Sequence, residues 1–333
     1  MEIRQIKANE VSLIQDFIEN HWKSGHSLVK SKVLLDFQHL MDNQYSFYAA
    51  VENNQVWSLQ GFIPTSKYDS SLNENYDVWG AIWKTREDSP DKLIGLSLLK
   101  AIELNYGKGS IGAIGISPIA KKIYTLLSWK TEYLRQYFII NETINDFTIA
   151  KFRTKPVFST HSVSPNWSIK IKYTLVACEQ PAEVYKPQKS IEYFINRYEH
   201  HPIYKYFFWC FYENEIIKAI WAVRRITINN RSIYRVVDVL GRIDEFPDMY
   251  NQIQDIIQTE FVEYIDMMNY GIDFAVFKNI GFDELDLEST ETIIPNYFEP
   301  FEQRNVKIEV AFKSDSEYVC FKGDADQDRP NIL

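Results

Sequence analysis

A chain of 333 residues that is 45% hydrophobic and 15% aromatic is long enough for two domains, and this composition excludes an intrinsically disordered protein. Its formal charge of −9 disfavours attraction to nucleic acid or to an anionic membrane, so neither is expected as a partner.

Cysteine usage and hydropathy give an expectation about location. Cys178, Cys210 and Cys320 form no CxxC pair, and the charged start lacks the apolar segment of a signal peptide. The most apolar run, 203–212, is too short to span a bilayer, which takes about 20 residues. We therefore expect a cytoplasmic protein without membrane insertion.

The first 145 residues alternate between segments with strand and helix patterns. Residues 2–6 read as a strand, and apolar residues recur at helical spacing from about Asn9. Ser89 and Pro90 predict a helix start, as an N-cap followed by the first helical residue. The other expected elements are a helix at 32–41, strands within 45–64 and at 77–85, a strand at 110–116, a helix at 117–127 and a strand at 133–140.

The second half repeats this order after a polar stretch. We expect a domain at 1–145, a linker at 146–189 and a domain at 190–333. The expected elements are a strand within 167–177 of the linker, then a helix at 190–199, strands at 206–212, 216–227 and 233–241, helices within 247–261 and 273–282, and a strand at 305–312.

One motif resembles a known superfamily. The segment "SPIAKKIYTLLSW", 117–129, resembles the late segment of GNAT acyltransferases, N-x-x-A-x-x-L-Y-x-x-x-G-F. The positions that match or nearly match are Ala120, Ile123 and Tyr124, and the replaced positions are Ser117 for Asn, Ser128 for Gly and Trp129 for Phe.

The second half contains a similar segment, "FAVFKNIGF". Gly281 and Phe282 keep the family residues, and Phe277 stands 153 residues after Tyr124, at the corresponding position. The resemblance implies an α/β (α+β) fold of two GNAT-like domains, each with a mixed, mostly antiparallel central sheet flanked by helices.

The resemblance also implies a chemistry. In GNAT enzymes the pantetheine arm of acyl-CoA lies between two splayed central strands, an amine attacks the thioester, and a tyrosine protonates the leaving thiolate. Tyr124 would be this general acid, whereas the ring of Phe277 has no proton to give. The first domain would hold the thioester, and the degenerate second domain would help to form the acceptor cleft. The alternative is that Tyr124 only packs its ring on a helix face.

Acetyl-CoA is the implied cosubstrate. The family's pyrophosphate signature, [RQ]-x-x-G-x-[GA] at a helix N-terminus, is matched in residues 90–95 by Gly95 alone, and Asp91 adds a negative charge there. The residues assigned to the cofactor are Lys84, Arg86, Lys92, Gly95 and Ser117.

Three of the six histidines fall within residues 21–40. The pattern "HWKxGH…LLDxQH" is similar to a segment of tandem GNAT proteins of bacterial surface-polysaccharide biosynthesis, which acylate nucleotide-linked amino sugars. In the GNAT fold the loop between the first two helices lies over the acyl-transfer end of the cleft, and our hypothesis is that His21, His26 or His39 takes the proton of the attacking amine. We assign His21 and His26 as catalytic, and Trp22, Gln38 and His39 as contacts to the substrate.

Two other interpretations of these histidines stay open. A metal could be held by His21, His26, Asp36 and His39, but the spacing matches no known ligand motif, so no metal is expected. The histidines could equally pack or form hydrogen bonds at a domain surface.

The tail "FKGDADQDRPN", 321–331, resembles the ending of the same polysaccharide-associated proteins. We assign Asp324, Asp326, Asp328 and Arg329 to the acceptor groove. The tail could instead be a solvated, mobile terminus.

The leading prediction is an N-acyltransferase that moves an acetyl or related acyl group from a CoA thioester to the amine of a nucleotide-linked amino sugar. One alternative is a FemX-like transferase that uses aminoacyl-tRNA. Another is a non-catalytic GNAT-like protein that binds a sugar nucleotide.

Overall fold

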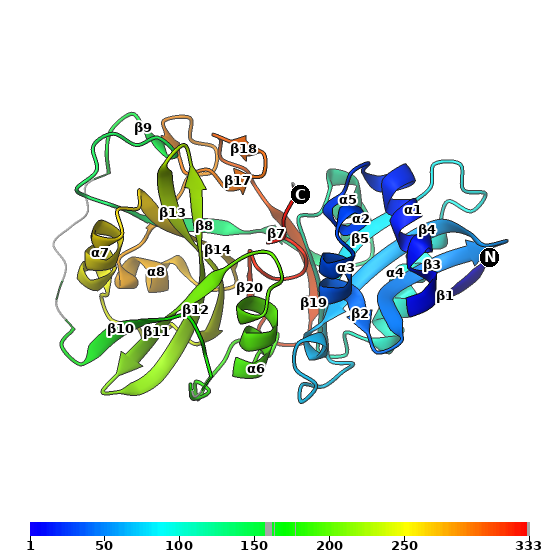
Figure 1. Ribbon diagram of the computed structural model, residues 1–333, viewed down its shortest axis with the longest axis horizontal. Coiled ribbons are helices and arrows are strands. Elements are labelled where there is room, and N and C mark those ends of the chain that lie inside the picture. The colour runs from blue at the N-terminus through cyan, green and yellow to red at the C-terminus, as the bar shows by residue number, and fades with distance from the viewer. Residues whose placement is uncertain (157–161, 163, 177, 332–333) are drawn as a thin grey trace.

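The protein is described by a computed structural model covering residues 1–156, 162, 164–176 and 178–331. Two eight-stranded sheets lie beside each other along the longest axis of the molecule (Figure 1). Each sheet is mixed, mostly antiparallel and flanked by helices, which confirms the expected fold class. Within the described residues, no helix is long and apolar enough to cross a membrane.

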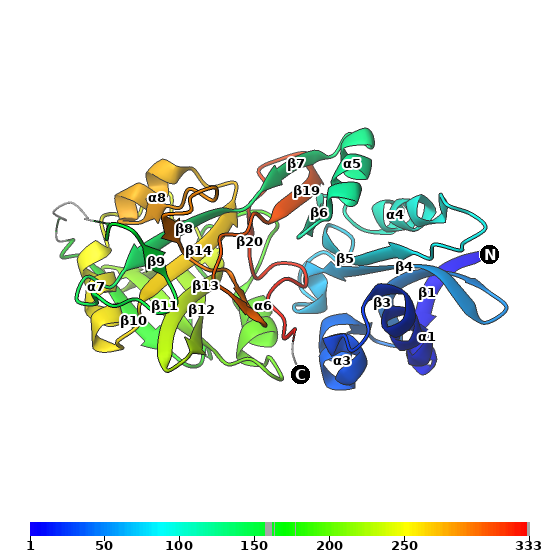
Figure 2. The same cartoon turned by 90° about the horizontal axis from the view of Figure 1, so that it is seen from above.

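The first sheet is built mainly from the N-terminal half. Helices α4 and α5 cover one face and α1 and α3 the other (Figure 2). The strands, in sheet order, are β1 (Glu2–Lys7), β3 (Gln44–Glu52), β4 (Gln55–Pro64), β5 (Asp77–Thr85), β6 (Ser110–Ile114), β19 (Glu309–Ser314) and β7 (Lys130–Tyr133), with β2 (Leu40–Met41) beside β3. The helices are α1 (Val11–Phe17), α2 (Ser27–Lys30), α3 (Lys32–His39), α4 (Ile94–Asn105) and α5 (Pro118–Leu126).

The second sheet has the same plan. Its strands, in sheet order, are β10 (Trp167–Lys172), β11 (Tyr206–Glu213), β12 (Ile216–Ile228), β13 (Arg231–Gly241), β14 (Tyr264–Tyr270), β8 (Arg135–Ile140) and β15 (Asp283–Glu284), with β20 (Cys320–Phe321) beside β14. The helices are α6 (Ile191–Phe194), α7 (Tyr250–Thr259) and α8 (Phe274–Ile280). Two short ribbons pair β9 (Lys151–Phe152) with β16 (Thr292–Ile293) and β17 (Tyr297–Phe298) with β18 (Phe301–Glu302).

Short helical turns complete the element list. Helices α1 and α6 each continue into a π-helical turn, Ile18–Trp22 and Ile195–Glu199 respectively. One 3₁₀ turn, Ala8–Glu10, precedes α1, and another, Thr65–Lys67, follows β4.

The two sheets exchange one strand each. Strand β8 comes from the N-terminal half but pairs with β14 of the second sheet, while β19, from the C-terminal end, lies between β6 and β7 of the first. Each sheet thus contains a strand from the other half of the sequence. The strand expected within the linker 146–189 is β10, and residues 157–161, 163 and 177 of that linker lie outside the described residues.

The two copies of the GNAT-like motif end their helices in the same way. Trp129 donates its backbone N–H to the carbonyl of Tyr124, and Phe282 donates to Phe277, both at 2.9 Å. Ser128 and Gly281 take left-handed φ values of 60° and 113° at the equivalent positions. The local geometry therefore supports two copies of one fold.

Helix α4 begins later than the sequence predicts. It starts at Ile94, whereas Ser89 and Pro90 precede it in a turn. The side chain of Ser89 donates to the carbonyl of Asp91, and the carboxylate of Asp91 accepts from the backbone N–H of Leu93. These local bonds compete with the helix, so the expected N-cap was wrong.

Candidate functional site

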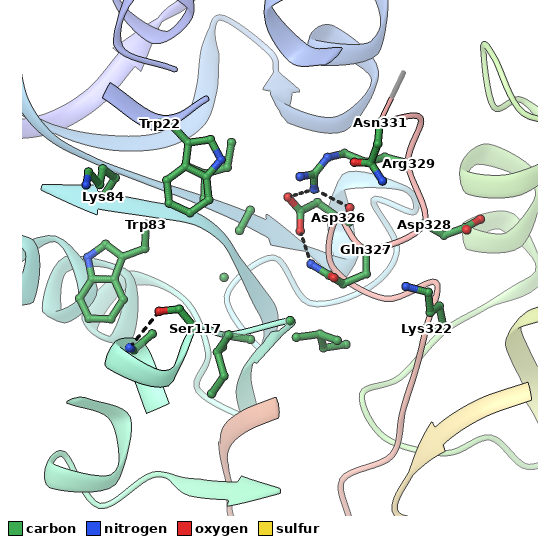
Figure 3. A pocket seen from close by; sticks show the side chains of 18 of the residues that line it. Trp22, Trp83, Lys84, Ser117, Lys322, Asp326, Gln327, Asp328, Arg329 and Asn331 are labelled. Carbon is green, nitrogen blue, oxygen red and sulfur yellow. Dashed lines mark hydrogen bonds and ion pairs between the residues drawn. The ribbon is translucent and has the colours of Figure 1, made fainter. Parts of the chain in front are cut away.

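A pocket opens where two central strands of the first sheet separate. Strands β5 and β6 are paired in parallel only over 77–80 and 110–113. Strand β5 then continues to Thr85 with no strand partner on that side among the described residues. The pocket, of about 740 Å³, lies between these diverging strands, α5 and the C-terminal tail (Figure 3).

The pocket has one wall from each half of the chain. The N-terminal wall consists of Trp22, 80–85, Lys92, Gly95, Leu96, 113–117, Ile119, Ala120, Ile123 and Tyr124. The C-terminal wall consists of Tyr204, Arg224, Arg235, 296–299, Lys322, 326–329 and Asn331.

Tyr124 lies on α5 with its hydroxyl at the point where the strands separate. A Cβ atom added to Gly80 would be 3.9 Å from the Tyr124 oxygen. The ring lies between Trp83 and Trp129, with centroid distances of 5.4 and 4.4 Å. Burial, and then the charge of Glu103, raises the pKa of Tyr124. The phenol is therefore protonated at neutral pH and can donate a proton into the pocket.

Four of the five residues assigned to the cofactor line the pocket. Ser117 is the N-cap of α5, and its hydroxyl accepts from the backbone N–H of Ala120 at 3.2 Å. Gly95 lets α4 approach β5, because a Cβ there would be 2.7 Å from the hydroxyl oxygen of Thr85. Lys84 and Lys92 also line the N-terminal wall.

Arg86 does not line this pocket. Its guanidinium lies over the ring of Trp57, 4.4 Å from the centroid, and forms an ion pair with Asp88 at 2.6 Å. Both interactions hold the side chain outside the pocket.

The C-terminal tail fills the equivalent gap in the second sheet. Strands β13 and β14 are paired in parallel only over 234–236 and 265–267. Beyond this point Lys322 donates its backbone N–H to the Met268 carbonyl at 3.1 Å, and Gly323 donates to the Val237 carbonyl at 2.7 Å. In the second sheet, the backbone of the C-terminal tail thus occupies the position that the pocket has in the first sheet.

The tail is held by buried charges and is not a solvated terminus. The ammonium of Lys189 lies 2.5 Å from a carboxylate oxygen of Asp238 and 2.8 Å from one of Asp324. Arg197 donates to the carbonyls of Gly323 and Ala325. Asp324 is fully buried and does not line the pocket.

The other assigned tail residues do reach the pocket. Asp328 forms an ion pair with Arg224 at 3.0 Å and accepts a hydrogen bond from the Tyr206 hydroxyl at 2.5 Å. Burial opposes its charge, but Arg224 and Tyr206 lower the pKa of Asp328. Asp326 forms an ion pair with Arg329.

His26 lies behind the pocket wall. Its Nδ1 faces the backbone N–H of Leu28 at 3.2 Å, and its Nε2 faces the guanidinium of Arg329 at 3.2 Å. A neutral imidazole has one lone pair for these two donors. Burial, and then Arg329, lowers the pKa of His26 to about 4. The structure therefore gives His26 a structural role, as the N-cap of α2 in contact with Arg329.

The other residues of the histidine segment are not brought together. His21 packs against Phe17, with ring centroids 5.3 Å apart, and does not line the pocket. Gln38 is buried outside the pocket, whereas Trp22 is partly exposed and lines it. Asp36 accepts from the Tyr45 hydroxyl at 2.5 Å. No group of three or more potential metal ligands forms within the part of the chain that the structure describes.

His39 is fully buried away from the pocket. Its Nδ1 lies 2.9 Å from the hydroxyl of Ser46, and its ring packs on Phe47. Burial lowers the pKa of His39 from 6.5 to about 3. The folded protein therefore keeps this ring neutral at pH values where the unfolded chain protonates it.

This difference predicts an acid-sensitive stability. Below pH 6.5 the unfolded state binds a proton that folded His39 does not, so the free energy of unfolding falls by about 1.4 kcal/mol per pH unit from this residue. Urea unfolding at pH 7 and pH 5 measures it. His39→Gln should flatten the pH dependence between these values by about 2 kcal/mol, and an unchanged slope would contradict the assignment.

The sequence did not point to several residues of the C-terminal wall. Arg224 and Arg235 lie within the apolar runs of β12 and β13. An arginine inside an apolar strand is the signal that could have identified them, because a charged residue is rarely buried unless it has a polar or charged partner nearby. Lys322 gave no such signal, since lysine is ordinary in a polar tail.

The fold is that of the GNAT acetyltransferases. The chain matches the crystal structure of a GCN5-related N-acetyltransferase from Anabaena variabilis with a TM-score of 0.53 and 8% identity, over 94% of this chain and 72% of that one. It also matches a probable N-acyltransferase from Enterococcus faecalis (TM-score 0.49, 9% identity, 85% and 70% of the chains) and a tandem GNAT protein from the clavulanic acid biosynthesis pathway (0.44, 9%, 98% and 100%). No protein-family model and no curated protein sequence matches the chain.

Proposed function

We propose that this protein is an N-acetyltransferase that moves the acetyl group of acetyl-CoA to the amine of a nucleotide-linked amino sugar. The observation that carries the reaction type is the Tyr124 hydroxyl at the point where β5 and β6 separate. The thioester lies along the unpaired end of β5, and Lys84 and Lys92 face the CoA phosphates. The amino sugar, and a role in surface-polysaccharide biosynthesis, are supported by the sequence resemblance.

The reaction needs two proton movements. The neutral amine attacks the thioester carbonyl carbon, the C–N bond forms, the C–S bond breaks, and Tyr124 protonates the departing sulfur. Glu299 is assigned to take the amine's proton. It accepts hydrogen bonds from the Tyr204 hydroxyl and the Asn331 N–H, and forms no ion pair within the described residues. Asp326 and Asp328, in contrast, are paired with arginines.

Each chain would bind one acetyl-CoA. The equivalent gap between β13 and β14 holds the backbone of Lys322 and Gly323. A side chain at Gly323 would bring its Cβ to 2.6 Å from the Val237 carbonyl oxygen, so there is no spare space beside the tail.

The test is release of free thiol from acetyl-CoA in the presence of UDP- and dTDP-linked amino sugars, with the product mass recorded. We expect thiol release and the gain of one acetyl group on one of these sugars. Thermal stabilisation by CoA without turnover would overturn the acceptor class. No stabilisation and no turnover would overturn the acetyltransferase assignment, and binding of aminoacyl-tRNA would then favour the FemX-like alternative.

A further inference from the structure

The pocket is cationic in a chain that is acidic overall. Its lining includes six lysine and arginine side chains and three carboxylates, whereas the whole chain carries a formal charge of −9. Lys84 and Lys92 lie at the end assigned to the CoA phosphates. The other four cations, Arg224, Arg235, Lys322 and Arg329, belong to the C-terminal wall.

Three of these four cations already have a carboxylate partner. Arg224 pairs with Asp328, Arg329 pairs with Asp326, and Arg235 forms a buried pair with Asp266 at 2.5 Å. Lys322 has no carboxylate within ion-pair distance among the described residues. Its ammonium lies 5.5 Å from the ring centroid of Tyr297.

Lys322 is held in an unfavourable place. Only 6% of the residue is exposed, and the tail backbone fixes it through the bond to the Met268 carbonyl. Burial, and then the charge of Arg235, lowers the pKa of Lys322 to about 8, and the more distant charges of Asp328 and Asp266 offset this only in part. A buried cation without a direct carboxylate partner costs stability, so this lysine is not explained by packing alone.

A second donor of the same wall also lacks a partner. The Nε of Arg224 is buried without an acceptor among the described residues, and its guanidinium lies 3.8 Å from the ring centroid of Tyr204. Figure 3 shows the Lys322 ammonium directed toward the tail residues that line the pocket. A nearly buried ammonium and a buried N–H that both lack acceptors are suited to an anionic ligand.

We propose that Lys322, with Arg224 beside it, forms a subsite for an anionic group of the acceptor, a phosphate or a carboxylate. This inference rests on the proposed function, because it concerns the molecule whose amine is acylated. The bound anion supplies the missing acceptor and counter-charge. An acceptor with such a group would therefore be preferred over a neutral amine.

The first experiment measures binding without any acyl transfer. Pyrophosphate and glutarate are titrated calorimetrically into the Lys84→Met/Lys92→Met protein, which lacks the cations of the other end. We expect Lys322→Met to weaken at least one probe by tenfold or more and Lys322→Arg to retain binding. If only pyrophosphate binds, the anionic group of the acceptor is assigned as a phosphate. If only glutarate binds, it is assigned as a carboxylate. Equal affinities with and without Lys322 would overturn the subsite.

Melting temperature separates this role from a structural one. Lys322→Met removes a buried charge that has no ion pair among the described residues, so the unliganded variant should melt at the same temperature as the parent or higher. A clear drop in melting temperature would make Lys322 a structural residue and overturn the proposal. Exposed Lys170, which pairs with Glu215 outside the pocket, provides the control Lys170→Met, expected to leave both probes unaffected.

A kinetic comparison distinguishes failure of the subsite from failure of the proposed reaction. With turnover, Lys322→Met should raise KM for a nucleotide-linked amino sugar and leave KM for free glucosamine unchanged. An equal loss of kcat with both would assign Lys322 to proton transfer and overturn the subsite. If no acceptor turns over while anion binding still depends on Lys322, the proposed reaction fails and an anion site remains.

Discussion

Replacing Tyr124 with phenylalanine is expected to lower kcat by about 100-fold or more while the dissociation constant of acetyl-CoA stays within about twofold. The variant keeps the ring between Trp83 and Trp129 and removes only the hydroxyl. The thiolate then leaves without a proton donor. Steady-state thiol release and calorimetric titration of acetyl-CoA measure the two quantities separately.

Tyr106→Phe is the matched control for this experiment. Tyr106 is buried in the same hydrophobic cluster, does not line the pocket, and its hydroxyl accepts from Gln5 at 3.3 Å. Removing the Tyr106 hydroxyl in Tyr106→Phe should leave kcat unchanged. Full activity of Tyr124→Phe would remove this hydroxyl from the mechanism. Equal loss in both variants would indicate damage to the cluster instead.

The second large effect is expected at Lys189, which binds the tail to the second sheet. Burial opposes its charge, but Asp238 and Asp324 outweigh this and raise the pKa of Lys189. Lys189→Met leaves two carboxylates buried beside each other without a cation. We expect the free energy of unfolding, measured in urea, to fall by about 3–5 kcal/mol.

A compensated variant tests the cause of that loss. Lys189→Met combined with Asp238→Asn and Asp324→Asn removes the buried charges together, and should recover most of the stability. The exposed pair of Lys170 with Glu215 serves as reference, because Lys170→Met should cost less than about 1 kcal/mol. A similarly small loss at Lys189 would contradict the anchoring role.

Local elements of the fold were predictable from the sequence, whereas strand partners were not. The motif helix α5 and the strands β3 and β4, expected within 45–64, follow from periodicity over short distances. The exchange of β8 and β19 depends on pairings between residues far apart in sequence, such as Ile139 with Ile265. Periodicity shows that such a segment is a strand, and does not show which sheet it joins.

The same limit applies to the pocket. Tyr124 and Ser117 were assigned from the resemblance of 117–129 to the GNAT motif, Lys92 from the segment before α4, and Asp326 and Asp328 from the tail motif, and all five line the pocket. The histidine segment was misleading in one respect. A cluster of histidines in sequence says little about burial, and His21, His26 and His39 are all absent from the pocket lining.

The strand exchange has a consequence for how the protein is made. Protein chains are synthesised from the N-terminus, and a domain usually folds once its own residues have emerged. Here the first sheet has an open edge at β6 until β19 arrives, almost 200 residues later. The first sheet therefore stays incomplete until residues 309–314 have been synthesised. A chain released before β19 is synthesised would have an unpaired edge at β6 and would lack the tail residues of the C-terminal wall of the pocket.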